Sequence, residues 1–215
     1  MNTLITTYYE NPELFYLFLE NNYNTQYFSN LIVIDDCSKK YPAEDVLKEI
    51  NPINTELYRV TEDLGFNSHG ARNLAAKLCQ TEWMTFLDVD TLLAPSSFIK
   101  IQDFIELEEF CWLEIYFNQF LIPKRYYMVS GGYDERFNGY HWGDFVFLNR
   151  LHTLFFGERL DFEVSVINKR PFHYLGKQRQ FLQDLEQDIE QNTSKNPLHW
   201  YKHKTINFEW EKIWI

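Results

Sequence analysis

The chain has few cysteines and no long apolar run, and these two shortages exclude several classes of protein. Its three cysteines, Cys37, Cys79 and Cys111, lie far apart and form no Cys-x-x-Cys pair, so neither a zinc ribbon nor a disulfide framework is predicted. No apolar run approaches the roughly 18 residues of a membrane span. The N-terminus enters a strand pattern at once, without the basic region of a signal peptide. A reducing, cytoplasmic location is the expectation.

Positive charge is also scarce. The chain carries 20 Lys and Arg against 31 Asp and Glu, which gives a formal net charge of −11. Such a balance argues against a nucleic-acid partner, which requires a basic footprint, and against docking on anionic lipid. An acidic protein that handles an anionic diphosphate would need a cation between the two, so the charge is consistent with a metal site.

The remaining composition is that of one globular domain, because 215 residues with 45% hydrophobic and 24% charged side chains can bury a core of ordinary size. The aromatic content of 18% is high. Exposed Tyr and Trp side chains would be compatible with a surface that stacks on sugar rings. The alternative is a core built from large residues, and most of the 19 Phe are expected there.

Strand patterns alternate with helix patterns through the first half of the chain. Predicted strands cover residues 3–7, 31–34, 56–60 and 83–87. Predicted helices begin at Pro12, with Asn11 as N-cap, and cover residues 43–50 and 67–79. The alternation predicts an α/β fold with a mostly parallel sheet, flanked by helices and joined by right-handed crossovers. In the second half, strands are predicted at 112–117 and 126–129, and helices at 96–109, 143–155 and 178–191.

Two acidic pairs follow predicted strands directly. Asp88 and Asp90 come after residues 83–87, and Asp35 and Asp36 come after residues 31–34. Ligands of open α/β sheets bind beyond the carboxyl ends of the strands, and carboxylates there suit Mg²⁺ or Mn²⁺, which can hold a diphosphate. One pair could therefore hold a metal and the other could bond a base or a ribose. The alternatives are a solvated turn for the first pair and a turn or helix cap for the second.

A third feature is the string from Gly131 to Asp144. The paired glycines Gly131 and Gly132 allow close backbone approach or positive φ, and aromatic side chains then alternate with polar ones. Asp144 ends the string just before a helix pattern, where an aspartate is often only an N-cap. The string as a whole is too specific for capping to be its sole role.

Taken in order, these segments resemble a family 2-type glycosyltransferase with the GT-A fold, close to the galactosyltransferase-like and polypeptide N-acetylgalactosaminyltransferase-like branches. The matching segments are residues 6–11, 32–38, 70–73, 88–90 and 131–144. The resemblance covers roughly residues 3–175. It implies metal-dependent transfer of a sugar from a nucleotide-diphosphate sugar, with a UDP-sugar as the expected donor, to a hydroxyl of a carbohydrate or glycoconjugate acceptor.

The resemblance also implies how the donor would be bound. Thr6 and Tyr8 would line the pocket for the nucleotide base, and Asp36 or its neighbour Asp35 would bond that base. Arg72 would contact the donor near the diphosphate. The alternative for Arg72 is a surface charge on a helix.

For the metal and the chemistry, the resemblance assigns Asp88 to the ribose or the metal, and Asp90 to the metal directly. His173 falls where many members place a histidine ligand, and the ion would be Mn²⁺ or Mg²⁺. Asp144 would be the general base of an inverting transfer, and a retaining transfer is the alternative. A structural role is the alternative for His173.

On the acceptor side the resemblance places Gly132, Tyr140 and Trp142, although Trp142 could instead be a core residue. The chain departs from its relatives at two positions: Gly143 replaces a common glutamate and Val146 a common aspartate. This departure motivates a second candidate, a catalytically silent sugar- or nucleotide-binding module.

Two further interpretations are weaker. A sugar nucleotidyltransferase would need a glycine-rich loop after the first strand, and residues 6–11 contain no glycine. His199 and His203 are four residues apart, but no partner ligand is evident, so they are expected to be solvated or packing residues.

The resemblance divides the chain into a GT-A domain, residues 1–175, and a helical and aromatic extension, residues 176–215. The extension is expected to pack on the same domain. It could cover the acceptor side, cap the sheet or mediate self-association, and its tryptophans are expected to pack rather than bind: Trp200, Trp210 and Trp214.

Overall fold

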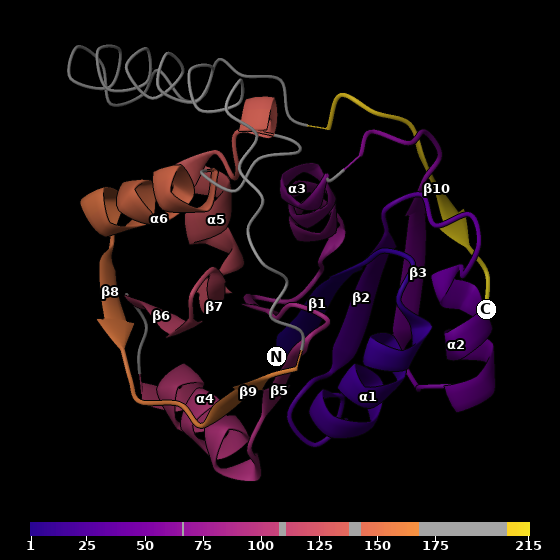
Figure 1. Ribbon diagram of the computed structural model, residues 1–215. Helices are drawn as coiled ribbons and strands as arrows, with labels where there is room; N and C mark the ends of the chain where they lie inside the picture. Colours follow the sequence, from indigo (N-terminus) through magenta and orange to yellow (C-terminus); the bar gives the residue numbers. More distant parts are fainter. Residues whose placement is uncertain (66, 108–110, 138–142, 168–205) are drawn as a thin grey trace.

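The computed structural model describes residues 1–65, 67–107, 111–137, 143–167 and 206–215 (Figure 1). Within them a mixed sheet of eight strands has the order β10-β3-β2-β1-β4-β7-β6-β8. The strands are β1 (Asn2–Tyr8), β2 (Asn30–Asp35), β3 (Thr55–Val60), β4 (Trp83–Phe86), β6 (Cys111–Tyr116), β7 (Gln119–Pro123), β8 (Phe156–Arg159) and β10 (Trp210–Ile213). A separate pair joins β5 (Thr91–Leu93) to β9 (Val164–Val166), antiparallel.

The first four strands form the parallel centre of the sheet, as the sequence predicts. β1 lies between β2 and β4 and runs parallel to both, and β3 continues beyond β2. Because all four run in one direction, their carboxyl ends share one edge. β7 is antiparallel to β4, and β6 pairs with β7 antiparallel and with β8 parallel.

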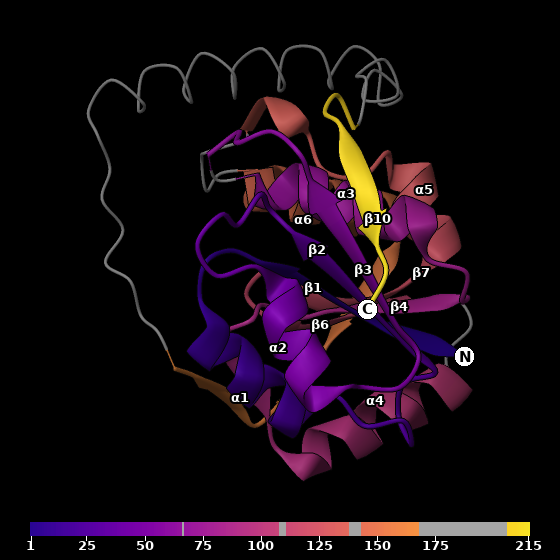
Figure 2. The ribbon, with the colours of Figure 1, turned by 90° about the vertical axis from the view of Figure 1, so that its right-hand side faces the viewer.

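Helices cover both faces of this sheet (Figures 1 and 2). One face is packed by α1 (Pro12–Asn22), α2 (Ala43–Ile50) and α4 (Pro95–Leu107), and the other by α3 (Ser68–Leu78), α5 (Lys124–Ser130) and α6 (Gly143–Leu154). Strand side chains alternate between the two cores, since Leu4 belongs to the first and Ile5 to the second. A strand that is buried on both faces has apolar side chains at every position, which explains the continuous apolar run of residues 31–34.

The start of α1 confirms the predicted cap. The side chain of Asn11 accepts a hydrogen bond from the Leu14 amide at 3.2 Å, and Pro12 occupies the first helical position. Proline needs no hydrogen-bond acceptor there and brings a helical φ.

The strand prediction for residues 126–129 is wrong, because they lie in α5. Pro123 precedes this helix, and Gly131, with φ +81°, ends it. The strand was predicted because tyrosine favours β-strands and two tyrosines stand in this segment. The burial does not alternate as in a strand: Tyr127 is buried, while its neighbours Met128 and Val129 are both half exposed. The strand in this region is β7, which the sequence pattern missed.

The end of the chain adds an edge strand to the sheet. β10 runs antiparallel to β3, Trp210 packs edge-on against Tyr58 with ring centroids 5.7 Å apart, and Lys212 pairs with Glu56 at 3.0 Å. The helix predicted at 178–191 lies outside the described residues, as do Trp200, His199 and His203. The division at residue 175 therefore stays a prediction. No helix in the described part of the chain has both the length and the apolar character that crossing a bilayer requires.

Burial in the parallel centre generates a first prediction. Ile32 in β2 is fully buried, whereas Ile53 in the loop between α2 and β3 is 67% exposed. Replacing Ile32 by Ala should lower the free energy of unfolding by about 2–5 kcal/mol, because a cavity opens in the core. The matched control Ile53→Ala should change it by less than about 0.5 kcal/mol. Urea unfolding of both variants measures the difference, and equal losses would contradict the assigned burial.

Candidate functional site

The site lies beyond the carboxyl edge of the parallel strands. Asp36 follows β2 and Asp88 follows β4. The first two turns of α3 carry His69, which contacts Asp144 of α6, and Arg72, which contacts Asp88. This is the edge at which open α/β sheets bind ligands. The segments that carry these residues are far apart in the chain and meet because the strands are parallel.

Asp35 has a structural role in this arrangement. It is fully buried, and its two carboxylate oxygens accept hydrogen bonds from the amides of Ser38 (2.8 Å) and Ala43 (3.0 Å). Arg59 adds an ion pair at 3.4 Å. The carboxylate therefore fixes the loop from β2 into α2, which is the turn-and-cap alternative for this residue.

Asp36 is placed differently. It is 5% exposed, and its Oδ2 accepts the amide of Asn67 at 2.9 Å, but its Oδ1 has no partner among the described residues. The Thr6 hydroxyl on neighbouring β1 is also buried without a partner in the described part of the chain. Burial raises the pKa of Asp36 to about 6, against the lowering effect of the Asn67 amide. Buried polar atoms without partners cost about 1–3 kcal/mol each, so these two atoms are ready to bind a polar ligand.

Tyr8 is not at the opening of the site. Its ring is buried against Phe15, with centroids 4.9 Å apart, and its hydroxyl donates to the Tyr41 carbonyl at 2.5 Å. The contribution of Tyr8 is therefore to the core and to the loop that carries Tyr41.

Arg72 is buried, which excludes the surface-charge alternative. Its guanidinium donates to the Asn118 carbonyl and the Tyr133 hydroxyl, both at 2.8 Å, and to Asp88 Oδ1 at 2.5 Å. Burial alone would lower the pKa of Arg72, but Tyr133, Asp88 and Asp144 together raise it above its ordinary value. The cation is therefore permanent.

Asp88 and Asp90 lie where the sequence predicts a metal site. The Asp88 side chain is 40% exposed and bonded to Arg72, and Asp90 lies two residues further on, beside Thr91 of β5. Magnesium and manganese bind through one or two carboxylates completed by substrate phosphates, and these hard oxygen donors fit that requirement. Among the described residues no three His, Cys, Asp or Glu side chains converge on one point, and His173 lies outside them.

Asp144 stands in the first turn of α6 with a side chain that is 10% exposed. Its Oδ1 lies 3.1 Å from Nε2 of His69, a buried residue in the first turn of α3. The sequence analysis missed His69. The signal that could have found it is its spacing, because a residue three positions before Arg72 lies on the same face of a helix.

The glycine-rich string folds against α3. Gly132 has φ +70°, and a Cβ there would lie 2.4 Å from Asn73 Oδ1, so only glycine fits. Tyr133 is buried; its amide donates to Asn73 Oδ1 at 2.8 Å and its hydroxyl to Asn118 Oδ1 at 2.6 Å. Asn73 belongs to the matching segment 70–73, but the sequence analysis assigned it no role, and it did not single out Asn118. Tyr140 and Trp142 lie outside the described residues.

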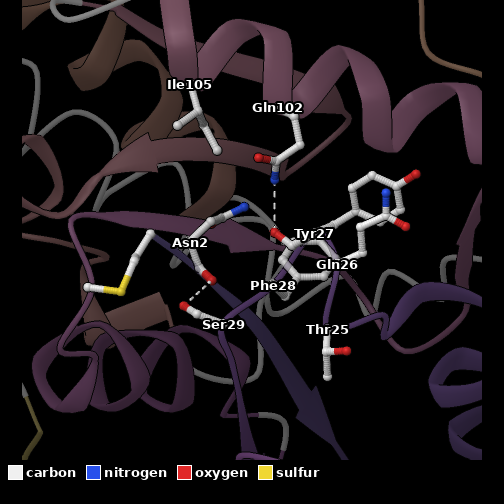
Figure 3. Close-up of a pocket in the computed structure, with 9 residues that line it drawn as sticks. Asn2, Thr25, Gln26, Tyr27, Phe28, Ser29, Gln102 and Ile105 are labelled. Atoms are coloured by element: carbon white, nitrogen blue, oxygen red, sulfur yellow. Dashed lines mark hydrogen bonds between the residues drawn. The ribbon is translucent and has the colours of Figure 1, made fainter.

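A cavity of about 190 Å³ opens at the other end of β1 (Figure 3). Its polar groups bond one another, since Gln102 donates to the Tyr27 carbonyl at 2.9 Å and the Ser29 hydroxyl to the Asn2 carbonyl at 3.0 Å. None of its lining side chains carries a carboxylate or a basic group. It lies at the amino ends of the strands, away from the acidic cluster.

Comparison with known proteins agrees with this architecture. The family model described as "Glycosyl transferase family 2" matches residues 3–159, and the model "Glycosyltransferase like family 2" matches residues 111–213. No curated protein sequence matches the chain.

Solved structures of S. aureus TarS share the fold. TarS 1–349 superimposes with a TM-score of 0.61 at 16% identity, over 74% of this chain and 57% of that one. The same protein in complex with UDP-GlcNAc gives a TM-score of 0.68 at 13% identity, over 92% of this chain and 66% of that one. The complex with UDP gives 0.59 at 16% identity. The chain thus spans less than two thirds of the TarS chains it matches.

The α/β architecture is that of the GT-A glycosyltransferases, and one family model covers well over half of the sequence. The chain therefore belongs to glycosyl transferase family 2.

Proposed function

We propose that the protein transfers a sugar from a nucleotide-diphosphate sugar, with UDP as the nucleotide, to a hydroxyl of a carbohydrate or glycoconjugate acceptor. The observation that carries this proposal is the meeting of Asp36, Asp88 and Asp144 around α3, at the carboxyl edge of the sheet. Family membership and the likeness to TarS, whose structures include UDP and UDP-GlcNAc complexes, support the choice of donor.

The donor's base is assigned to the buried atoms that have no partner in the described residues. Asp36 Oδ1 is an acceptor for the N3–H of a uracil, and the Thr6 hydroxyl can both donate and accept. A site built to hydrogen-bond a base discriminates strongly, because the wrong base would leave these buried groups unpaired.

The diphosphate is assigned to Asp90 and Asp88 through a divalent cation, with His173 as a further ligand. When bound, the cation supplies Lewis-acid stabilisation of the charge that develops on the leaving diphosphate. Arg72 fixes Asp88 at the rim of this site, since the two groups are 2.5 Å apart and the guanidinium is buried. Burial raises the pKa of Asp88, and the positive charge of Arg72 opposes that effect.

The transfer itself is assigned to Asp144 as general base. Its carboxylate takes the proton of the acceptor hydroxyl while that oxygen bonds to the anomeric carbon, and the bond from this carbon to the diphosphate oxygen breaks with its electron pair. A single displacement of this kind inverts the configuration at the anomeric carbon. Only a tenth of the Asp144 side chain is exposed, which limits competing access of water.

One observation favours the second candidate, a catalytically silent binding module. Gly143 stands where many relatives carry a glutamate, and the structure leaves no room for a side chain there, since a Cβ would lie 2.7 Å from His69 Nε2. The enzyme is favoured because the chain carries all three of the acidic residues assigned to the metal and to catalysis, Asp88, Asp90 and Asp144.

Donor class and metal dependence are tested together by thermal unfolding with UDP, GDP, CMP or TDP, each with and without Mn²⁺. UDP with Mn²⁺ should stabilise the protein by about 2.7 kcal/mol at a hundredfold excess over its Kd. Asp90→Asn should lose the Mn²⁺-dependent part, and Asp103→Asn, on α4, is the matched control. An equal UDP shift in EDTA would contradict the metal assignment, and no shift with any nucleotide would favour the silent module.

Asp144→Asn tests the general base, because the amide cannot take a proton. Nucleotide release from UDP-GlcNAc, UDP-galactose and UDP-glucose should fall by roughly a hundredfold or more for whichever donor is turned over. The Kd for UDP should stay within threefold of that of the unaltered protein, as measured by calorimetry. Turnover that persists within a few-fold would show that the assigned role is wrong.

The raised pKa of Asp36 predicts a pH dependence of donor binding. Below its pKa of about 6 the carboxyl becomes protonated and is lost as an acceptor for the uracil N3–H, so affinity should weaken as pH falls from 7 to 5. UDP-GlcNAc is the probe, because it lacks the terminal phosphate whose second pKa is also near 6. Asp36→Asn should bind weakly at every pH. A profile that is flat for the unaltered protein would exclude Asp36 from base binding.

A further inference from the structure

The His69 ring lies between the candidate base and the buried core of the site. Its Nε2 is 3.1 Å from Asp144 Oδ1, and its face packs on the Tyr133 ring with centroids 5.1 Å apart. The ring is 1% exposed, on the first turn of α3. It is thus held on two sides, and its hydrogen-bonding edge is directed at Asp144.

We propose that His69 is the positioning residue of Asp144. It donates its Nε2–H to Oδ1 and so fixes the carboxylate with Oδ2 toward the acceptor hydroxyl. The inference rests on the proposed function of Asp144 and adds the group that orients it.

The tautomer of the His69 imidazole follows from the burial of its second nitrogen, Nδ1. Nδ1 of His69 is buried and has no hydrogen-bond partner among the described residues. A proton on Nδ1 would be a buried donor without an acceptor, which costs more than an unused lone pair. The proton is therefore assigned to Nε2, where the Asp144 carboxylate accepts it.

Gly143 makes room for this arrangement. A Cβ at position 143 would lie 2.7 Å from His69 Nε2, 2.8 Å from Cε1 and 3.0 Å from the Phe137 Cβ. The imidazole therefore occupies the space next to Asp144 that a side chain at position 143 would need. Gly143 and His69 form a matched pair, and the missing glutamate is the condition for the histidine to reach Asp144.

If His69 were only structural, its contribution would be the volume that its ring fills. If it positions Asp144, its contribution is the Nε2–H that it donates. Phe keeps the ring and removes the donor, and Gln keeps an N–H at nearly the position of Nε2 with less volume. His152 on α6 is the matched control for His→Phe, because its ring packs on Trp112, away from Asp144.

The first experiment measures kcat and KM for nucleotide release from the UDP-sugar that is turned over. His69→Phe should lower kcat at least tenfold with KM within threefold, while His69→Gln keeps kcat within threefold and His152→Phe changes neither. Full kcat in His69→Phe, or equal losses in the Phe and Gln variants, would overturn the inference. If Asp144→Asn is inactive while His69→Phe is active, this inference fails alone; if Asp144→Asn is active, the proposed function of Asp144 fails.

A double-mutant cycle tests the pair. Gly143→Ala should lower kcat several-fold in the unaltered protein, because it displaces the imidazole, but less than twofold when His69 is already Ala. Independent effects would overturn the pairing of Gly143 with His69.

A measurement independent of turnover reads the tautomer directly. Side-chain ¹⁵N NMR, with His69→Phe used for assignment, should show a protonated Nε2 and an unprotonated Nδ1. An Nε2 without a proton would overturn the inference even if no UDP-sugar is turned over.

Discussion

The ion pair of the buried Arg72 guanidinium with Asp88 is the interaction on which the rest of the site depends. A guanidinium removed from water is tolerated only when its hydrogen bonds are met, and here Asp88, the Asn118 carbonyl and the Tyr133 hydroxyl meet them. These partners come from the end of β4, the turn between β6 and β7, and the glycine-rich string. One cation thus joins three distant segments.

The helix α3 gives this interaction its geometry. The Asn67 amide just before it bonds Asp36, and His69 in its first turn bonds Asp144. One turn later Arg72 bonds Asp88, and Asn73 donates to the Tyr133 carbonyl at 2.9 Å. Residues three and four apart lie on one helix face, so one straight helix can reach carboxylates that belong to β2, α6 and β4. Displacing α3 would disturb all three at once.

Much of the fold was predictable because strands buried on both faces of the sheet require continuous apolar runs, which are easy to recognise in the sequence. The runs of β1, β2 and β4 and the helices α1, α2 and α3 stand out for that reason, and the acidic residues after the strands point to the carboxyl edge of the parallel strands. What failed depended on tertiary contacts. Tyr127 has a β-favouring side chain in a helix. Asp35 and Asp36 are adjacent and chemically equal, and only the amides of Ser38 and Ala43 distinguish them. His69 is recognised as a site residue only through its contact with Asp144, which is 75 residues away in sequence.

The charge balance of the site argues for the cation more strongly than the acidic motif does. A diphosphate carries negative charge into a chain of net charge −11. Arg72 cannot neutralise it in full, because its guanidinium is already paired with Asp88 and lies near Asp144. The diphosphate would then face Asp88 and Asp90 across a short gap, and like charges at such distances repel by several kcal/mol at the effective dielectric of a protein surface, roughly 4 kcal/mol at 4 Å. A divalent ion between them would turn this repulsion into attraction, and the pairing of Arg72 with Asp88 is therefore an argument for the metal in the proposed function.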